Sequence, residues 1–577
     1  MAEPMCPTCG LGLMPLPEEA AYCPRCGTRL AEGDDLNPEQ REAAGHAEGP
    51  ALVVAGAGTG KTRVIEYRVL ELVRRGVSPE TILLLTFTRR AAREMIGRAA
   101  RHDERCRRVQ GGTLHSFAWR TVQEFADALG LGRLRLLDAD DAMELLERAV
   151  REIARGQLRQ PQTVALIRGK AQALGRTIGQ VIDDDWPWLT EQSRLIESVA
   201  TAYAKAKADR GLVDFDDLIV LLDRLLDNAA VRAELGRRHR HVMVDEYQDT
   251  TPLEDRIARR IAEAHGNLMV VGDDAQSIYG FRGADQWNML TFPQRVAGAR
   301  VMVLPRNYRS TQSILNVANA VLGTMANAYS RTLVAADGQG GEPPVLAEAA
   351  SEGAEAAWVV GSIRDDAEAG LPLSRQAVLY RSSFASVSVQ AVLNRHRIPY
   401  RVVGGLRLSE QPHVKAFLAC LRVLADHADV PAWARVLRSG GMGAEAADRA
   451  AARVGNSPSL ASACRAAVEA GAPTDLVDAI AWAGEVAIAS VGARCRTLRD
   501  GLAGRLGRQF DDATDRLRDL DAICELADGY ADVRLLISDL VLDPVDRLSR
   551  GADAKVRDLL TLSTIHSAKG LEWESVY

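Results

Sequence analysis

A glycine-rich turn that follows a short apolar run constrains this chain more than any other feature of its sequence. Residues 52–54 (Leu-Val-Val) lead into residues 55–62, which read AGAGTGKT, and an amphipathic stretch follows over 64–73. Strand, glycine-rich turn and helix is the context of a phosphate-binding loop, because backbone N–H groups then close around phosphate oxygens at a helix N-terminus. The alternative is a glycine-rich surface turn, and the alanine at position 55, where the motif has glycine, is a mild departure.

Different residues of this loop would bind different parts of the nucleotide. Lys61 would reach the β- and γ-phosphates, and the hydroxyl of Thr62 would ligate Mg²⁺. The predicted nucleotide-binding residues of the loop are Ala55, Gly56, Ala57, Gly58, Thr59, Gly60, Lys61, Thr62 and Arg63.

A second apolar run ends in two carboxylates. Residues 241–244 (His-Val-Met-Val) have the pattern of a buried strand and are followed by Asp245 and Glu246. Asp245 can hold Mg²⁺ through water, and Glu246 can orient and deprotonate an attacking water. Carboxylates at a strand end are often only solvated caps. Downstream of a phosphate loop, however, the pair predicts ATP hydrolysis.

Composition narrows the class of protein. A chain of 577 residues predicts three to five domains or subdomains, and 47% apolar with 26% charged residues excludes a mainly disordered or fibrous chain. The net charge is −6, so the whole chain is not an electrostatic nucleic-acid binder, although a local basic face stays open. We expect a cytoplasmic protein, because no apolar stretch approaches bilayer-spanning length and the N-terminus lacks a signal-peptide pattern.

Four of the nine cysteines lie in the first 30 residues, in two C-x-x-C pairs that are each followed by glycine. They are Cys6, Cys9, Cys23 and Cys26. Two such pairs can supply four thiolates in a tetrahedron, which predicts a Zn²⁺ site; free thiols or two disulfides are the alternatives. A segment of roughly 30 residues cannot build a sufficient core, so metal binding would supply its folding energy.

The residues around Asp245 carry a resemblance to a known family. Residues 245–250 read DEYQDT, and from about residue 36 to its end the chain resembles the UvrD/Rep/PcrA-type superfamily 1A DNA helicases. Further family motifs occur in the family's order. They are LNPEQ at 36–40, TFTRRAA at 86–92, GTLHSF at 112–117, DFDDL at 214–218, GDDAQSIYGFRGAD at 272–285, NYRS at 307–310 and TIHSAKGLEW at 564–573.

This resemblance implies an α/β fold with two RecA-like P-loop motor lobes and helical inserts 1B and 2B. Ahead of them, the two C-x-x-C pairs resemble those of a small N-terminal zinc ribbon. We place the strand that opens the second lobe at 301–304, and the entry to insert 2B at 398–405. The predicted boundaries are 1–33 for the ribbon, 34–116 and 205–297 for lobe 1A, 117–204 for insert 1B, 298–381 and 552–577 for lobe 2A, and 382–551 for insert 2B.

The resemblance also implies roles at the nucleotide. Gln40 would read the adenine edge, Tyr308 would stack on adenine, and Glu572 would accept a hydrogen bond from ribose. Gln276 would sense the γ-phosphate, and Arg309 would stabilise charge on the transferred phosphoryl group. The predicted catalytic residues are Lys61, Asp245, Glu246, Gln276 and Arg309.

DNA contacts are implied at four of the motifs. Tyr279 and Phe281 alternate with small or polar residues, which suits an exposed platform that stacks a base; two core aromatics are the alternative. From Arg89 to Arg108, eight arginines stand against three acids, as in a phosphate-binding surface or a solvated helix face. The predicted DNA-binding residues are Phe87, Thr88, Thr113, His115, Tyr279, Phe281, Arg282, Thr564 and His566.

The leading hypothesis is an ATP-dependent 3′→5′ helicase or translocase on single-stranded and partly duplex DNA, acting in repair or replication. ATP, Mg²⁺ and Zn²⁺ are the expected cofactors, and the ribbon would dock on protein or nucleic acid. The sequence stops at Tyr577, where the family continues into a motif with a second arginine, so we expect a truncated gene or a fragment. The alternatives are a remnant that binds ATP and DNA without unwinding, and a subunit of a helicase–nuclease complex.

Overall fold

The computed structural model describes ten stretches of the chain, and the four N-terminal cysteines lie outside them. The stretches are 36–46, 48–132, 134–158, 160–338, 340–382, 385–403, 411–485, 490–509, 513–542 and 558–577. The chain divides into two compact units. The first is Met1–Leu114, Ala173–Gly175 and Asp223–Pro343, and the second is His115–Gln172, Arg176–Leu222 and Pro344–Tyr577.

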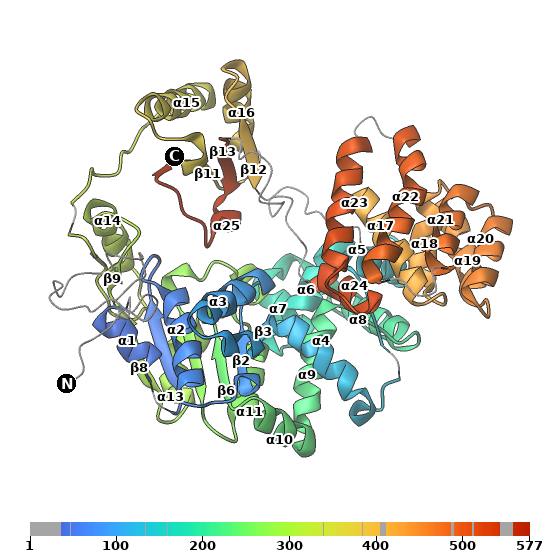
Figure 1. Ribbon diagram of the computed structural model, residues 1–577, viewed down its shortest axis with the longest axis horizontal. Helices are drawn as coiled ribbons and strands as arrows, with labels where there is room; N and C mark the ends of the chain where they lie inside the picture. The colour runs from blue at the N-terminus through green and yellow to red at the C-terminus, as the bar shows by residue number, and fades with distance from the viewer. Residues whose placement is uncertain are drawn as a thin grey trace, which may run out of the picture. The chain divides into compact units, whose positions relative to one another are not determined.

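A six-stranded, fully parallel sheet forms the centre of the first unit (Figure 1). Its strand order is β3-β2-β6-β7-β1-β8. The strands are β1 (Ala51–Ala55), β2 (Ile82–Leu85), β3 (Gln110–Gly112), β6 (His241–Val244), β7 (Leu268–Gly272) and β8 (Arg300–Leu304). Four of them, β1, β2, β6 and β7, are buried along their whole length, which explains why they read as continuous apolar runs rather than as alternating ones.

Helices on the faces of this sheet complete its core. α2 (Lys61–Arg74) and α3 (Arg89–His102) contribute Val64, Val69 and Met95 to a cluster that also contains strand residues such as Val53 and Met243. α1 (Pro38–Ala44) contacts α2 and β8. α10 (Ala229–Arg238) packs on α11 (Pro252–Ala262), which itself contacts β6 and β7. The parallel strand order leaves the carboxyl ends of β1, β6 and β7 at one edge of the sheet.

The strand at 301–304, expected to open the second motor lobe, lies in the first sheet. The boundary between the two motor lobes stays a prediction. This strand, β8, pairs with β1 in parallel, from Ala51 opposite Arg300 to Ala55 opposite Leu304. It completes the first sheet, since β1 would otherwise be an edge with unpaired backbone groups. The elements that follow, β9 (Arg306–Asn307), α14 (Gln312–Leu322) and β10 (Val334–Ala335), also belong to the first unit, which extends to Pro343.

The second unit contains a four-stranded parallel sheet of order β12-β13-β11-β14. Its strands are β11 (Gln376–Tyr380), β12 (Tyr400–Val403), β13 (Leu560–Thr564) and β14 (Ser575–Val576). Helices α15 (Glu352–Glu368) and α16 (Ser386–Arg395) supply the rest of its core, which includes Ile363 and Leu393. The stretch around 400, expected as the entry to insert 2B, therefore contributes a strand to this sheet, because Tyr400 to Val403 pair with Leu560 to Ser563.

Most of the remaining second unit is helical. The regions expected as inserts contain α4 (Leu114–Glu124), α5 (Ala139–Ala154), α6 (Pro161–Leu174), α7 (Ile178–Asp185), α8 (Ser193–Ala208), α17 (Pro412–Ala425), α18 (Val430–Ser439), α19 (Ala444–Gly455), α20 (Leu460–Glu469), α21 (Thr474–Glu485), α22 (Val491–Gln509), α23 (Ala513–Ala527) and α24 (Val533–Leu542). Among the described residues, one cluster of buried hydrophobic side chains runs through the helices from α17 to α24. Among the described residues, none of the helices combines the length and the apolar character that crossing a bilayer demands.

Buried charges join α5 to α17 and α18 within the second unit. The guanidinium of Arg422 pairs with Asp141 and, through Nε at 3.0 Å, with Asp429. All three side chains are less than 10% exposed. Arg435 adds contacts of 2.7 Å to Asp141 and 2.8 Å to Asp138. Since an unpaired charge in such a place would cost several kcal/mol, the contact between these helices depends on the full set of partners.

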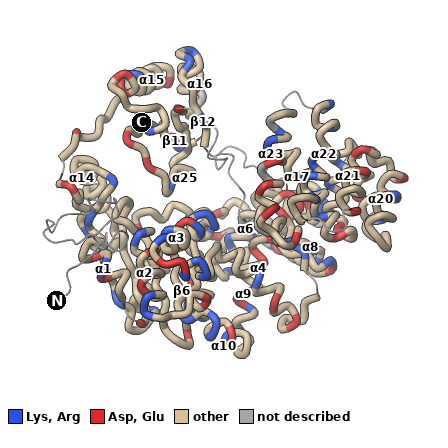
Figure 2. Tube along the Cα trace, in the orientation of Figure 1, with Lys and Arg blue, Asp and Glu red and all other residues tan. Residues whose placement is uncertain are grey.

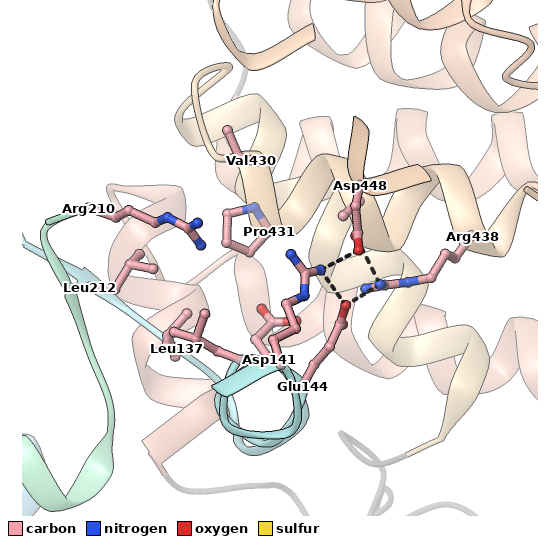
Figure 3. A pocket seen from close by; sticks show the side chains of 12 residues that line it. Leu137, Asp141, Glu144, Arg210, Leu212, Val430, Pro431, Arg438 and Asp448 are labelled. Atoms are coloured by element: carbon pink, nitrogen blue, oxygen red, sulfur yellow. Dashed lines mark hydrogen bonds and ion pairs between the residues drawn. The ribbon is translucent and has the colours of Figure 1, made fainter. Parts of the chain in front are cut away.

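A second group of four charges lies beside this one and lines a small cavity (Figure 3). Arg148 contacts Glu144 at 2.8 Å and Asp448 at 2.6 Å. Arg438 pairs with the same two carboxylates and closes a ring of alternating charge between α5, α18 and α19. Each carboxylate thus faces two guanidinium groups, so neither is left unpaired where the helices meet.

Removing the central guanidinium should destabilise the second unit strongly. We expect Arg422→Met to lower the free energy of unfolding by about 3–5 kcal/mol, because Asp429 would stay buried without its cation and Asp141 would keep only Arg435. Urea denaturation followed by circular dichroism measures the change. Arg449→Met is the matched control, since Arg449 and its partner Glu445 are both exposed, and it should cost less than about 1 kcal/mol. Equal losses in the two variants would contradict the argument.

Candidate nucleotide site and aromatic platform

The glycine-rich loop joins β1 to α2, as the sequence pattern predicts. Gly60 is the N-cap of α2 and accepts the first helical hydrogen bond, from Val64 N at 3.1 Å. Thr59 is fully buried, and its Oγ1 donates to Gly56 O at 2.8 Å, which folds the loop back on itself. The first N–H groups of α2 have no partner inside the helix, so this turn presents them, with the helix dipole, to an anion.

Three glycines are required by the shape of the loop. Gly58 and Gly60 have φ of +72° and +85°, a conformation that costs other residues energy. A Cβ on Gly58 would lie 2.6 Å from Cβ of Arg309, and one on Gly56 would lie 2.8 Å from the side chain of Leu333. The segment that carries Arg309 and Leu333 therefore packs directly on the loop.

That segment is held over the loop by Asn307 and Tyr308. Asn307 Nδ2 donates to Ala57 O at 2.6 Å, while its Oδ1 accepts from the backbone N–H of Arg309 and of Ser310 at 2.8 and 2.7 Å. Tyr308 N donates to Gly58 O at 2.8 Å. The ring of Tyr308 stays exposed, and its hydroxyl accepts from Asn37 Nδ2 at 2.9 Å. Tyr308 and Arg309 are thus placed beside the loop by hydrogen bonds to the backbone oxygens of Ala57 and Gly58.

Gln40 is also beside the loop, but its amide is used by the protein. Its Oε1 accepts from Asn37 N at 3.1 Å in a capping box, and its Nε2 donates to Thr59 O at 2.9 Å. The side chain is almost completely buried. In this structure Gln40 ties α1 to the phosphate-binding loop; the expected contact with an adenine edge stays a prediction.

The two carboxylates follow β6, next to the loop. Lys61 Nζ lies 3.4 Å from Glu246 Oε2, which Gln248 Nε2 also approaches at 2.5 Å. Glu246 has φ of +50°, unusual for a residue with a side chain, so the surrounding contacts hold its backbone in a costly conformation. Burial, together with the charge of Glu246, raises the pKa of Asp245 to about 7.

Asp245 fits the requirements of a magnesium ligand, and Thr62 as its partner stays a prediction. Oδ1 of Asp245 is buried and has no hydrogen-bond partner among the residues that the structure describes. Within the same residues, no group of three or more His, Cys, Asp or Glu side chains could hold a metal. The unpartnered oxygen of Asp245 suits Mg²⁺ at a nucleotide, which takes one or two protein oxygens and completes its shell with phosphate and water.

Residues after β7 complete the polar group. Gln276, in η6 (Asp274–Gln276), donates through Nε2 to Asp273 Oδ2 at 2.5 Å. Asp273 and Asp274 each pair with one terminal nitrogen of Arg331, whose side chain is 1% exposed. Tyr329 N adds a hydrogen bond of 2.9 Å to Asp274. The sequence did not indicate Arg331, because a single arginine in a loop far from any motif gives no signal. Asn307 lies in a recognised motif, but no role was predicted for it.

Four predicted DNA-binding side chains form an exposed aromatic platform in the first unit. The rings of Phe87 and Tyr279 are stacked, with centroids 5.4 Å apart and planes 8° apart. Phe281 lies 6.2 Å from Tyr279, and the guanidinium of Arg282 lies over both rings at 5.4 and 5.6 Å. Phe87 and Phe281 are 51% and 54% exposed, so these aromatics are not part of a core. Apolar rings open to solvent beside a cation suit base stacking.

Two other predicted residues of the first unit are structural in part. Thr88 is the N-cap of α3 and accepts from Ala91 N at 3.1 Å. Thr113 is buried after β3. The remaining predicted residues lie in the second unit: His115 packs on Phe215 with ring centroids 6.0 Å apart, Thr564 caps α25 (Ile565–Ala568), and His566 and Glu572 follow β13. The structure therefore brings together the predicted residues of the first unit. His115, Thr564, His566 and Glu572 are described only within the second unit.

The arginine-rich stretch lies on α3 and η2 (Glu104–Arg108), where Figure 2 marks a run of basic residues. Part of its charge is balanced by neighbouring acids. The ion pairs are Arg98–Glu94, Arg105–Asp103, Arg107–Glu104 and Arg108–Glu80. Arg90, Arg93 and Arg101 are exposed on α3. The surface thus combines solvated ion pairs with basic side chains that a phosphate backbone could reach.

Comparison with known proteins agrees with this geometry. Residues 36–297 match the UvrD/REP helicase N-terminal domain, and residues 302–453 match the UvrD-like helicase C-terminal domain. The chain is 30% identical over 571 residues to the ATP-dependent DNA helicase PcrA of Staphylococcus epidermidis, covering 94% of this chain and 77% of that protein. It is 32% identical over 609 residues to the ATP-dependent DNA helicase UvrD1 of Mycobacterium tuberculosis, covering 94% and 76%.

A shorter match is to the probable DNA helicase II homolog of Rickettsia conorii, 33% identical over 411 residues. It covers 70% of this chain, and the chain spans 62% of that relative's length. The extent of these matches defines the class: the chain belongs to the UvrD/Rep helicase family.

Crowding the loop at Gly58 should weaken nucleotide binding. We expect Gly58→Ala to reduce affinity for ADP at least about tenfold, because the new Cβ meets Arg309 and shifts the loop by an appreciable fraction of an ångström. Titration with a fluorescent ADP analogue measures the change. Gly76→Ala is the control, since Gly76 has a similar φ of +88° but open space around its Cβ position. Both variants pay the same backbone cost of about 1–2 kcal/mol, so equal affinities would contradict a steric role for Gly58.

Proposed function

We propose that this chain is an ATP-driven motor that moves 3′→5′ along single-stranded DNA, unwinds partly duplex DNA, and acts in DNA repair or replication. The observation that carries the proposal is the placement, in one unit, of a phosphate-binding loop, the Lys61–Glu246 contact and an exposed aromatic platform. Loop and carboxylate together support hydrolysis of a nucleoside triphosphate, and the platform supports sequence-independent contact with bases. The direction and the pathway rest on the family resemblance.

The chemistry follows from the positions of the side chains. N–H groups of the loop and the Lys61 ammonium bind the β- and γ-phosphates. Glu246 accepts a proton from a water whose oxygen bonds to the γ-phosphorus, while the bond from phosphorus to the β–γ bridging oxygen breaks and leaves ADP and phosphate. Arg309 stabilises the charge on the transferred group. Mg²⁺ bound by Thr62 and Asp245 would neutralise phosphate charge.

The base and ribose of ATP have candidate partners as well. Tyr308 is the proposed adenine-stacking residue, which its exposed ring and its attachment to Gly58 O support. Gln40 and Glu572 are the proposed contacts for the adenine edge and the ribose. On the DNA side, Tyr279, Phe281 and Phe87 would stack bases. The further proposed contacts are Arg282, Thr88, Thr113, His115, Thr564 and His566.

The first test is ATP hydrolysis with and without single-stranded DNA. We expect DNA to stimulate turnover, and Glu246→Gln to lower it by at least about 10²-fold, because an amide cannot accept the proton of the attacking water. The expected affinity for ATP is unchanged, since the loop is intact. Absence of DNA-stimulated turnover in the unmodified chain, despite ATP and DNA binding, would instead support a remnant that does not cycle.

Strand displacement tests the proposed direction. A duplex with a 3′ single-stranded tail should be unwound, and the same duplex with a 5′ tail should not, because a 3′→5′ motor must load on the strand that it follows. Unwinding from the 5′ tail alone would contradict the proposal. Binding to both substrates without displacement would support the remnant.

We also propose that Cys6, Cys9, Cys23 and Cys26 bind one Zn²⁺ and form a ribbon that docks on protein or nucleic acid. The support is the C-x-x-C spacing, because these residues lie outside the described part of the chain. We expect about one zinc per chain by elemental analysis of the purified protein, and a loss of that zinc in a Cys6→Ser, Cys9→Ser variant. Cys106→Ser is the control, since Cys106 is buried in the first unit. Purified protein without zinc would contradict the ribbon.

A further inference from the structure

Gln248 joins two of the strand ends that meet at the candidate nucleotide site. It lies in η5 (Tyr247–Asp249), two residues after Glu246, and it is 0% exposed. Its Nε2 donates to Glu246 Oε2 at 2.5 Å, and its Oε1 accepts from Asp273 N at 2.9 Å. One amide therefore spans the gap from the end of β6 to the end of β7.

The two contacts require an amide. A carboxylate needs a donor, and a backbone N–H needs an acceptor; the carboxamide of glutamine offers both from one side chain. An ionised glutamate could not donate to Glu246, and methionine could make neither bond. The hydrogen bond to Glu246 involves a charged acceptor and is therefore among the stronger kinds.

The surrounding chain is shaped to admit this amide. A Cβ on Gly272 would lie 2.6 Å from Gln248 Oε1, so only glycine at the end of β7 lets the amide reach Asp273 N. On its other side, the left-handed backbone at Glu246 brings Oε2 within reach of both Gln248 and Lys61. Strained backbone of this kind persists where neighbouring contacts determine it.

The same amide is connected to the aromatic platform. The backbone N–H of Asp273 donates to this amide. The carboxylate of Asp273 accepts from Gln276 Nε2 through Oδ2 at 2.5 Å and forms an ion pair with Arg331. Ser277 Oγ donates to the backbone oxygen of Gln248 at 3.1 Å. Tyr279 and Phe281 follow within four residues of Ser277. A shift of residues 276–281 on a bound base would therefore reach Gln248 through two separate hydrogen bonds.

We propose that Gln248 is a positioning residue that orients Glu246 and couples it to the aromatic platform, so that DNA on the platform accelerates hydrolysis. The inference rests on the proposed function. Gln248 acts through Glu246 and need not touch ATP. Removing it should misplace the carboxylate while leaving the phosphate-binding loop unchanged.

The test compares Gln248→Met with a matched control. We expect Gln248→Met to lower kcat of DNA-stimulated ATP hydrolysis at least about tenfold, because a misplaced catalytic group loses rate steeply, while the Kd for a fluorescent ADP analogue stays within about twofold. The stimulation ratio, with DNA over without, should fall as well. Gln376→Met is the control: Gln376 is equally buried, hydrogen-bonds Leu371 O and Tyr577 Oη, and lies on β11 in the second unit. It should lower the melting temperature without changing the stimulation ratio.

Two further variants separate positioning from mere stability. Gly272→Ala keeps the amide of Gln248 but crowds its oxygen, and it should also lower kcat. It takes the place of Gln248→Met in the test if that variant does not fold. The second is the double variant Glu246→Gln, Gln248→Met, measured in single-turnover assays. Its rate of hydrolysis should be less than about twofold below that of Glu246→Gln alone, because the effects of residues that act as one unit are not additive.

The outcomes are distinct. Wild-type kcat and stimulation in Gln248→Met overturn the inference, as does a full further loss in the Glu246→Gln background. If the unmodified chain shows no DNA-stimulated hydrolysis, the proposed function fails, and the inference fails with it.

Discussion

Parallel pairing of β1, β7 and β6 is the constraint on which the first unit depends. The registers place Val54 opposite Gly272 and Val244 opposite Val270, so the loops that follow these strands leave the sheet at one edge. Contacts between distant parts of the chain follow from that alignment: Lys61 and Glu246, which are 185 residues apart, come within 3.4 Å. A shift of one strand by one residue would reverse its side chains and separate these groups.

The polar groups at this edge are satisfied mainly by one another. Asp273 uses one carboxylate oxygen for Gln276 and the other for Arg331, and Gln248 uses both ends of its amide. A buried polar network is stabilising only when its members are paired, so each partner limits where the others can lie. Asp245 Oδ1 and Arg331 Nε, both buried and without a partner among the described residues, depart from this rule, and the Asp245 oxygen is the one suited to a cation. The site thus stores an unfavourable burial that a ligand would relieve.

Local sequence pattern predicted the features that depend on local chemistry, and it does not reach those that tertiary strand pairing decides. The run at 52–54, the glycines and the carboxylates at 245–246 were sufficient for the strand, loop and acid arrangement. The strands at 300–304 and 400–403 are both short, and nothing in their sequences indicates which sheet they join. The pairing with β1 and with β13 decides it. Partners such as Arg422 and Asp141, 281 residues apart, leave no periodicity in the sequence. Gln40 was predicted by resemblance beside the loop, but the sequence could not show that Asn37 and Thr59 use its amide.

The alanine at position 55 shows how the fold tolerates a departure from a motif. Ala55 is the last residue of β1, pairs with Leu304 of β8 and is fully buried in the core of the first sheet, so its methyl group adds to packing rather than narrowing the loop. The steric demands begin one residue later. Gly56 faces Leu333, Gly58 and Gly60 need positive φ, and a side chain at 60 would meet Gln40. The loop therefore depends on glycine where the backbone turns toward its ligand and neighbours, and not where the strand still belongs to the sheet.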